Sequence, residues 1–399
     1  MNPRFSKSLK SKYKMRASNL LTTAGVFLIF SLIFFSSCKN GKHKKSSTFE
    51  LKGDLAQAGE GIMVYLDRLA PNDSIEHLDS TAIDKSGNFV FNTEGIYKGF
   101  YTIRITKGDF AALILDSNEK ATLTGNAQNL GYTYDISGSP DSKLFWKYNI
   151  ISKTHRMQID SMQRVFESIV NGQRNNKKRM DSLNDAFEKP FDSINKLYDK
   201  ALKNLIRSNS SSFACLAAIQ ELAPDEDKDY YYSLDSGLMA KYGSSSYIKL
   251  FHSTIEAMKK VDIGAQAPDF SAPDTTGTEV SLASLHGKYV LIDFWASWCE
   301  PCKESLPDLI KIYDEYKDKN FTILGVSLDN QKGAWKAAIK HFNLQWTQIS
   351  ELKKWNSKVV KLYNFDGIPF TVLISPEGKI IAKKLSDSQL EDKLQAVLQ

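Results

Sequence analysis

At residues 293–303 the sequence reads Asp293-Phe-Trp-Ala-Ser-Trp-Cys299-Glu-Pro-Cys302-Lys303 and follows directly on the apolar run Tyr289-Val-Leu-Ile. A continuous apolar run is typical of a central parallel strand that is covered on both faces. A helix is expected to begin at Cys299, because Pro301 then lies in its first turn, where a missing N–H costs least. The segment therefore predicts a buried strand that ends beside a helix N-terminus.

The rest of residues 262–399 alternates between strand-like and helical segments. The strand-like segments lie at 321–326, 370–375 and 379–384, and the helical segments at 332–341 and from 386 onward. Strands that alternate with helices predict a layered α/β sheet. This part of the chain is the one expected to carry chemistry.

Two cysteines with C-x-x-C spacing stand at the predicted helix start. Unpaired N–H groups and the helix dipole stabilise an anion there, which lowers the pKa of the Cys299 thiol and yields a nucleophilic thiolate. Cys302 is close enough to attack a mixed disulfide formed at Cys299. A zinc site is the alternative, but it needs further ligands, and the domain offers only the isolated His286 and His341. We expect a redox pair, no metal and no cofactor.

With these motifs, residues 262–399 resemble the thioredoxin-fold thiol:disulfide oxidoreductases of the TlpA/ResA type. The resemblance rests on the motif Ala267-Pro-Asp-Phe, the segment Asp293–Cys302 and the motif Gly367-Ile-Pro-Phe. It covers about a third of the chain. It implies a C-terminal α/β thioredoxin fold and a role in cytochrome c biogenesis or general disulfide reduction, and nothing in the sequence chooses between these roles.

The resemblance assigns roles to three residues at the centre of the motif. Cys299 matches the attacking cysteine and Cys302 the resolving cysteine, so the two would form the redox-active disulfide. Asp293 matches a buried acid that assists proton transfer at the resolving thiol. Burial raises the pKa of a carboxyl group toward the working range. The alternative for Asp293 is a structural acid held by hydrogen bonds.

Three further residues are expected to meet the substrate. Pro369 matches the proline that follows a cis peptide bond in this family, and cis bonds are rare and retained for geometry. The backbone of Ile368 would then pair with an extended substrate segment. Trp298, just before the first cysteine, is expected to shield the site, with ordinary core packing as the alternative.

The first 37 residues have the pattern of an export signal. Six basic side chains and no acidic one precede an apolar run from Leu20 to Phe35. Cys38 follows two serines, which resembles a bacterial lipoprotein box, although Phe35 stands where leucine is usual. We expect residues 1–37 to be a lipoprotein signal peptide, Cys38 to carry lipid and residues 38–47 to be a tether; an uncleaved signal anchor is the alternative.

Composition and charge exclude several classes of protein. Hydrophobic residues make up 42% and charged residues 25% of the chain, which excludes a mostly disordered or polytopic membrane protein. The net charge is +6, and the six basic residues of the leader account for all of it. Nucleic-acid binding needs positive charge clustered on the working domain, so no nucleic-acid partner is expected.

The middle of the chain divides into two regions with different patterns of apolar residues, so we expect a multidomain protein. Residues 48–138 show short alternating runs between turn residues, which predicts an antiparallel β-sandwich of seven or eight strands. Residues 139–261 have apolar residues at helical spacing, which predicts a central α-helical region. Pro190 is expected to kink or break one helix, and Cys215 to be a buried free cysteine.

Two rival functions can be weighed against disulfide exchange. A thiol peroxidase needs Thr or Ser three residues before its cysteine and an arginine for the peroxide. Ala296 stands at that place, and no arginine follows Arg207. The other rival is a non-enzymatic partner-binding lipoprotein with an auxiliary thioredoxin-like domain, and the intact Cys299, Cys302, Asp293 and Pro369 speak against it.

The charges beside the cysteines favour a reductant of protein disulfides. Glu300 places a negative charge next to Cys299, which disfavours the thiolate, and solvent is expected to screen Lys303. An exported reductant needs a membrane thiol electron donor, because its compartment supplies oxidant. The expected location is the cell envelope, as a periplasm-facing lipoprotein on the inner or outer membrane.

Overall fold

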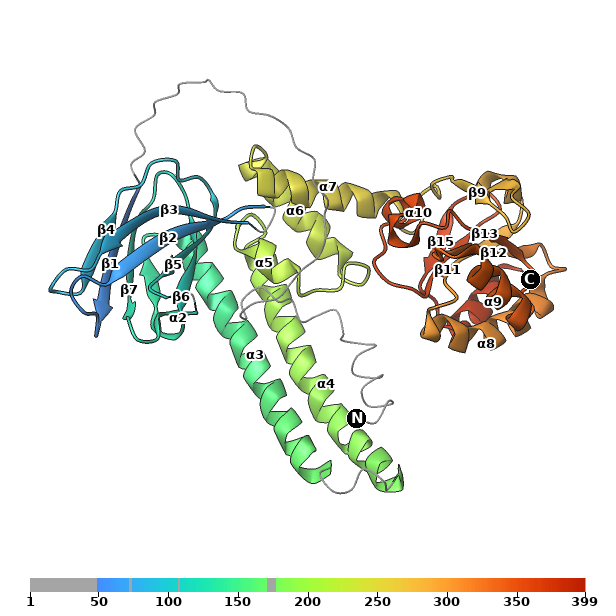
Figure 1. The fold of residues 1–399 in the computed structure, drawn as a ribbon, viewed down its shortest axis with the longest axis horizontal. Coiled ribbons are helices and arrows are strands. Elements are labelled where there is room, and N and C mark those ends of the chain that lie inside the picture. The colour runs from blue at the N-terminus through green and yellow to red at the C-terminus, as the bar shows by residue number, and fades with distance from the viewer. Residues whose placement is uncertain (1–48, 72–73, 107, 171–176, 399) are drawn as a thin grey trace. The chain divides into compact units, whose positions relative to one another are not determined.

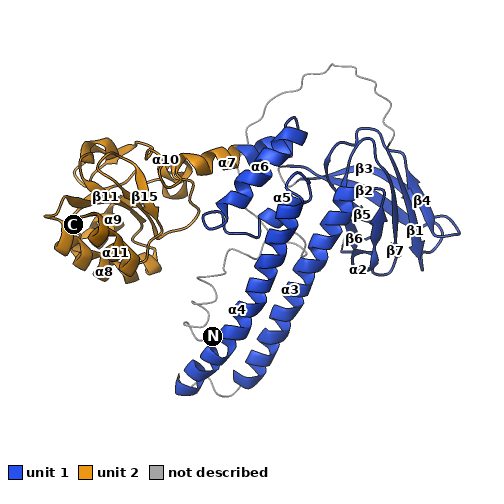
Figure 2. Cartoon of the chain, turned by 180° about the vertical axis from the view of Figure 1, so that it is seen from behind, with its two compact units in different colours: residues 1–252 blue, residues 253–399 orange. Residues whose placement is uncertain are grey.

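The computed structural model describes residues 49–71, 74–106, 108–170 and 177–398 (Figure 1). The expected signal peptide and the whole expected tether, residues 38–47 with Cys38, lie outside the described residues. The chain divides into two compact units, residues 1–252 and 253–399 (Figure 2). Across the described residues, no helix is both long and apolar enough to cross a membrane.

The N-terminal unit begins with two four-stranded sheets. One sheet has the order β4-β1-β7-β8, with β4 at Asn88–Phe91, β1 at Glu50–Ala56, β7 at Lys120–Asn126 and β8 at Asp135–Ser137. The other has the order β3-β2-β5-β6, with β3 at Ile75–Ala82, β2 at Met63–Leu69, β5 at Gly99–Arg104 and β6 at Phe110–Leu115. Buried side chains of both sheets, such as Leu51 and Leu66, form one hydrophobic cluster.

The expectation of purely antiparallel pairing is wrong at one position. Strands β1 and β7 pair in parallel, with Leu51 beside Ala121 and Leu55 beside Gly125. Parallel neighbours need a long connection, and here the chain forms β2 to β6 between them. Local alternation of apolar residues does not reveal a pairing between strands so distant in sequence.

Helices make up the rest of this unit. They are α2 at Leu130–Thr133, α3 at Pro140–Val170, α4 at Lys177–Ser208, α5 at Cys215–Ile219, α6 at Lys228–Tyr242 and α7, which runs from Ser246 to Lys260 across the unit boundary. Helices α3 and α4 lie side by side (Figure 1) and pack through Phe166, Val170 and Met180. The helix α4 continues through Pro190, so the expected break is absent. It contacts α3 before the proline through Leu183 and Phe187, and after the proline through Tyr198, whose ring stacks on His155 at 4.0 Å. Cys215 is buried and free, and burial raises the pKa of its thiol to about 12.

The C-terminal unit is built on a five-stranded sheet of order β13-β12-β11-β14-β15. The strands are β11 at Tyr289–Trp295, β12 at Phe321–Ser327, β13 at Thr347–Ile349, β14 at Phe370–Ile374 and β15 at Ile380–Lys383. The helices are α8 at Glu300–Tyr316, α9 at Lys332–Phe342, α10 at Lys358–Leu362 and α11 at Asp387–Val397, and a hairpin of β9 at Ser271–Pro273 and β10 at Glu279–Ser281 precedes the sheet. This is a thioredoxin fold.

The central strand β11 fixes the position of the cysteines. It pairs in parallel with β12 and in antiparallel with β14, and six of its seven residues are buried. The carboxyl end of β11 therefore lies beside the start of β14. The loop after β11 leads to Cys299, and the loop before β14 contains Pro369, so both loops lie at one edge of the sheet.

Candidate active site

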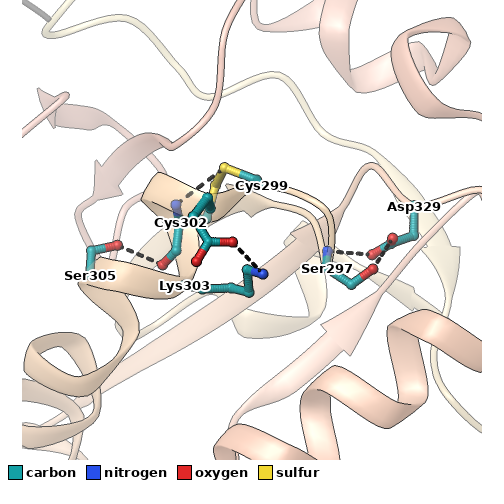
Figure 3. The surroundings of a disulfide bond; sticks show 7 residues. Ser297, Cys299, Cys302, Lys303, Ser305 and Asp329 are labelled. Atoms are coloured by element: carbon teal, nitrogen blue, oxygen red, sulfur yellow. Dashed lines mark hydrogen bonds and ion pairs between the residues drawn. A yellow bond between two sulfur atoms is a disulfide. The ribbon is translucent and has the colours of Figure 1, made fainter. Parts of the chain in front are cut away.

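Cys299 and Cys302 form a disulfide at the N-terminus of α8 (Figure 3). Cys299 is the N-cap residue of α8, and its Sγ accepts a hydrogen bond of 3.2 Å from the backbone N–H of Cys302. Both cysteines are largely buried. A thiolate at Cys299 would meet this N–H and the positive end of the helix dipole, which lower the pKa of a thiol.

A buried carboxylate holds the turn that carries Cys299. The backbone N–H of Cys299 donates to the carbonyl of Ala296 over 3.0 Å, which closes the turn. Within it, the backbone N–H of Ser297 donates to Asp329 over 3.0 Å and the hydroxyl of Ser297 does so over 2.6 Å (Figure 3). Asp329 also accepts a bond of 2.8 Å from Ser327 at the end of β12. Sequence reasoning missed Asp329, although an acid directly after a buried strand is a signal for it.

Asp293 lies near the end of the central strand and is buried. Burial raises the pKa of its carboxyl group to about 7, and repulsion from Asp387 adds to the increase. Asp387 stands in the first turn of α11, and burial raises its own pKa as well. Asp293 is therefore a group that exchanges its proton near neutral pH.

The loop before β14 contains a cis peptide bond between Ile368 and Pro369. Phe370, the next residue, pairs with Phe294 of β11, five residues before Cys299. The side chain of Pro369 is exposed, and Ile368 is partly buried. This loop and the turn before Cys299 therefore border the same end of the sheet.

Trp298 is 45% exposed, which does not fit the alternative of core packing. Its ring lies 6.3 Å from the ring of Trp355, centroid to centroid, and Trp355 is itself 42% exposed. Sequence reasoning missed Trp355, which stands in the short 3-10 helix Lys354–Asn356 after β13. The pairing arises from the tertiary fold, and no local pattern indicates it.

The charges on the first turn of α8 differ from the expectation in one respect. Lys303 lies 2.6 Å from Glu300 and forms an ion pair with it, whereas we expected solvent to separate Lys303 from the site. The pairing has a simple cause, because residues three apart face each other on a helix. Lys303 therefore offsets part of the repulsion between Glu300 and a thiolate at Cys299.

A shallow groove of about 770 Å³ lies between α8 and α9, and two of the residues that line it, Ser297 and Glu300, are near neighbours of Cys299 in sequence. Its walls include Ser297, Glu300 and Lys303 on one side and Ala334, Ala338 and Phe342 on the other. Among the residues that the structure describes, no group of three or more His, Cys, Asp or Glu side chains could hold a metal ion.

Comparison with known proteins places this site in a family. Residues 263–383 match the model of the AhpC/TSA family, and residues 49–145 match a domain of unknown function, DUF4369. The chain is 30% identical over 141 residues to the thiol-disulfide oxidoreductase ResA of Bacillus cereus, a match that covers 35% of this chain and 79% of that protein. The chain belongs to the ResA family of thiol-disulfide oxidoreductases.

Other members of the ResA family and solved structures each match about a third of the chain. ResA of Bacillus subtilis (strain 168) is 26% identical over 151 residues, which cover 37% of this chain and 83% of that protein. The thioredoxin domain of a thiol-disulfide oxidoreductase from Bacteroides vulgatus is 39% identical to this chain. The match covers 34% of this chain and 98% of that domain's chain, with a TM-score of 0.33. A thiol-disulfide oxidoreductase from Bacteroides fragilis is 38% identical, and the match covers 33% of this chain and 99% of that protein's chain, with a TM-score of 0.32. As a member of the ResA family, the chain is a thiol-disulfide oxidoreductase, and the purely non-enzymatic alternative falls away.

Proposed function

We propose that this protein is a membrane-anchored, extracytoplasmic reductant of protein disulfides that works through Cys299 and Cys302. The observation that carries the proposal is the Cys299–Cys302 disulfide at the N-terminus of α8, in a chain of the ResA family. The N-cap position supports Cys299 as the attacking residue, because the helix dipole and the N–H of Cys302 favour a thiolate there.

The reaction consists of two thiol–disulfide exchanges. The thiolate of Cys299 attacks one sulfur of the substrate disulfide, a mixed disulfide forms, and the other substrate sulfur leaves as a thiolate. Cys302 then loses its proton and attacks the Sγ of Cys299, which breaks the mixed disulfide and releases the second substrate thiol. The substrate gains two electrons, and the enzyme is left with the Cys299–Cys302 disulfide.

Asp293 acts as the base for the second exchange. Its pKa of about 7 supports this role, because a base works best when its pKa lies near the working pH. It stands on the strand that leads directly into the active-site turn. The proton of the Cys302 thiol would pass to the Asp293 carboxylate as Cys302 attacks.

Substrate binding uses the loop before β14 and the ring of Trp298. The cis bond before Pro369 supports a role for the backbone of Ile368 in pairing with an extended substrate segment. The ring of Trp298 is exposed and the residue directly precedes Cys299, which supports a role in shielding the approach to Cys299. Disulfide-containing proteins are therefore the proposed substrates.

The proposed location rests on residues outside the described part of the chain. The basic and apolar leader of residues 1–37 and the lipoprotein-like Cys38 support export and lipid anchoring in the cell envelope. Oxidised enzyme would then be recharged by a membrane thiol electron donor. Cys38→Ala should abolish fatty-acid labelling of the protein in cells, and unchanged labelling would exclude the anchor.

The N-terminal sheets and helices have a proposed role in choosing the partner. Residues 48–138 would form a β-sandwich domain and residues 139–261 a helical region, ahead of the thioredoxin-like domain at 262–399. The two sheets with one shared core and the long helices α3 and α4 support this division.

Insulin reduction tests the proposed function. The full chain, reduced with dithiothreitol and supplied with more of it, should accelerate the precipitation of insulin B chains. A Cys299→Ser/Cys302→Ser double variant is the control and should match the uncatalysed rate. Equal rates for the native chain and the double variant would refute the proposed activity.

A further inference from the structure

A short loop after β13 brings a second exposed tryptophan to the active site. Trp355 lies 6.3 Å from Trp298, which directly precedes the attacking cysteine, and 6.4 Å from Phe365, both measured between ring centroids. The ring of Phe365 stacks at 4.9 Å on Phe370, which directly follows Pro369. Trp355 thus connects the turn before Cys299 with the loop of the cis bond.

The loop that carries Trp355 is fixed by hydrogen bonds at both ends. At its start, the hydroxyl of Ser350 donates to the carbonyl of Ser327 over 2.8 Å and accepts from the N–H of Leu352 over 3.1 Å. At its end, the carboxylate of Glu351 accepts from the hydroxyl of Ser357 and from the N–H of Lys358, each over 2.6 Å. These bonds determine the backbone path on both sides of Trp355.

The path itself is strained at two residues that are not glycine. Leu352 has a φ of 55° and Lys354 a φ of 49°, a region that L-amino acids with side chains rarely occupy. Such conformations persist only where the surroundings over-determine them, and they cluster at functional sites. Here the strained path leaves the large ring of Trp355 42% exposed, so packing of the core does not explain it.

The segment of sequence around Trp355 is basic, although Lys353 also lies 3.8 Å from Glu351. Residues 351–361 contain four lysines and one glutamate, and Lys353 and Lys354 directly precede the tryptophan. The side chains of Lys353, Lys354 and Lys358 are all exposed. A partner that lies across Trp355 therefore meets apolar surface in the centre and positive charge at the rim, an arrangement in which charge selects the partner.

We propose that Ser350–Ser357 is a substrate-specificity loop for extended polypeptides. The paired rings of Trp298 and Trp355 bind a large apolar side chain of the substrate, next to the substrate cysteine that Cys299 attacks. The lysines favour acidic substrate residues beyond this side chain. This inference rests on the proposed function, because it names the substrate class of the same site. A small disulfide such as glutathione disulfide carries no such side chain and gains little from the loop.

Two disulfide-linked peptides and glutathione disulfide test the loop, with the full reduced chain as the enzyme. One peptide has Phe beside its cysteine and two Glu beyond it, and the other has Ser and two Lys at these places. Trp355→Ala should lower kcat/KM for the Phe-Glu peptide about tenfold, the usual size of a buried aromatic contact. The rate with glutathione disulfide should fall much less. Trp355→Phe should restore most of the loss, which guards against a folding defect.

Two more variants sharpen the result. Lys354→Glu should shift the preference from Glu-flanked toward Lys-flanked peptides of otherwise equal sequence. Tyr132→Ala, which removes an exposed aromatic ring in the N-terminal unit, is the matched control. It should change neither the preference for the Phe-Glu peptide over glutathione disulfide nor the preference between Glu-flanked and Lys-flanked peptides.

The outcomes separate this inference from the proposed function. Equal losses on peptide and glutathione disulfide, or no loss at all, would overturn the specificity loop while leaving the proposed function intact. A native chain that reduces none of the three substrates would refute the proposed function itself. If Trp355→Ala left the selectivity unchanged but altered the mass in sedimentation, the rings would bind a second copy, and the proposal would be overturned.

Discussion

Asp293 is a carboxylic acid in a buried strand of its domain, and this position couples stability to pH. An aspartate in an unfolded chain titrates near pH 4, whereas burial raises the pKa of Asp293 to about 7. Between these values the folded protein holds a proton that the unfolded chain has released. The free energy of unfolding therefore falls as the pH rises through this window and stays at its lower level above it.

Asp293→Asn should remove this penalty, because the amide is neutral at every pH. At pH 8 the variant should be more stable than the native chain by about 2–4 kcal/mol, and at pH 4 the difference should nearly vanish. Urea denaturation of the oxidised protein at both pH values measures this. Asp366→Asn, at an exposed position, is the control and should change stability by less than about 0.5 kcal/mol. A variant that is less stable than the native chain at pH 8 would contradict the prediction.

The same substitution separates a catalytic role from a structural one. Asn cannot accept the proton of Cys302, so the second exchange should slow by about a hundredfold, a usual contribution of a general base. The first exchange should keep its rate. Acid quenching of a single turnover, followed by mass spectrometry, should show the mixed disulfide accumulating. Equal decay of the mixed disulfide in both proteins would make Asp293 a structural residue only.

At the scale of elements, the turn between β11 and α8 depends on Asp329 at the end of β12. Asp329→Ala removes the acceptor for the N–H and hydroxyl of Ser297 and for the hydroxyl of Ser327. A buried polar group that loses its partner costs about 1–3 kcal/mol. The variant should therefore lose about 2–4 kcal/mol in the C-terminal unit, measured by urea denaturation. Ser297→Ala should lose less stability than Asp329→Ala. If Asp329→Ala were as stable as the native chain, the turn would not depend on Asp329.

The first turn of α8 sets the reduction potential through two opposite charges. Glu300 disfavours a thiolate at Cys299, and Lys303, paired with Glu300 at 2.6 Å, favours it. We expect a midpoint more negative than about −200 mV for the native chain. Because a stabilised thiolate raises the potential, Glu300→Gln should raise the midpoint by about 10–20 mV and Lys303→Gln should lower it by a similar amount. Titration against dithiothreitol measures all three, and shifts of the same sign would contradict the electrostatic explanation.

At the scale of the whole molecule, the sequence predicts the elements better than their partners. The apolar run 289–292 indicates a central strand, and the position of Cys299 before Pro301 indicates a helix start, because both signals are local. The parallel pair of β1 and β7 joins strands about 70 residues apart, and no local pattern encodes it. Likewise, Asp329 meets Ser297 and Trp355 meets Trp298 only because β12 and β13 lie where they do in the sheet. The pair of Glu300 and Lys303, by contrast, follows from helical spacing and could have been predicted.

Helix α4 shows how tertiary packing outweighs a local helix-breaking signal, the proline at position 190. Pro190 removes one hydrogen bond, at a cost of about 3 kcal/mol, yet the helix extends from Lys177 to Ser208. Its apolar residues, Leu183 and Phe187 among them, pack against the cluster at Phe166. Many such contacts together outweigh one lost hydrogen bond. Their total contribution cannot be predicted from the proline alone.

The most direct test of the central claim traps the mixed disulfide on the full chain. Cys302→Ser leaves Cys299 able to attack but removes the thiol that resolves the product. Incubated with an oxidised protein substrate such as insulin, this variant should accumulate a covalent complex that peptide mass spectrometry locates at Cys299. Cys299→Ser, treated in the same way, should accumulate none. A complex that forms on Cys302 in the Cys299→Ser variant, with none in Cys302→Ser, would contradict the assignment of Cys299 as the attacking residue.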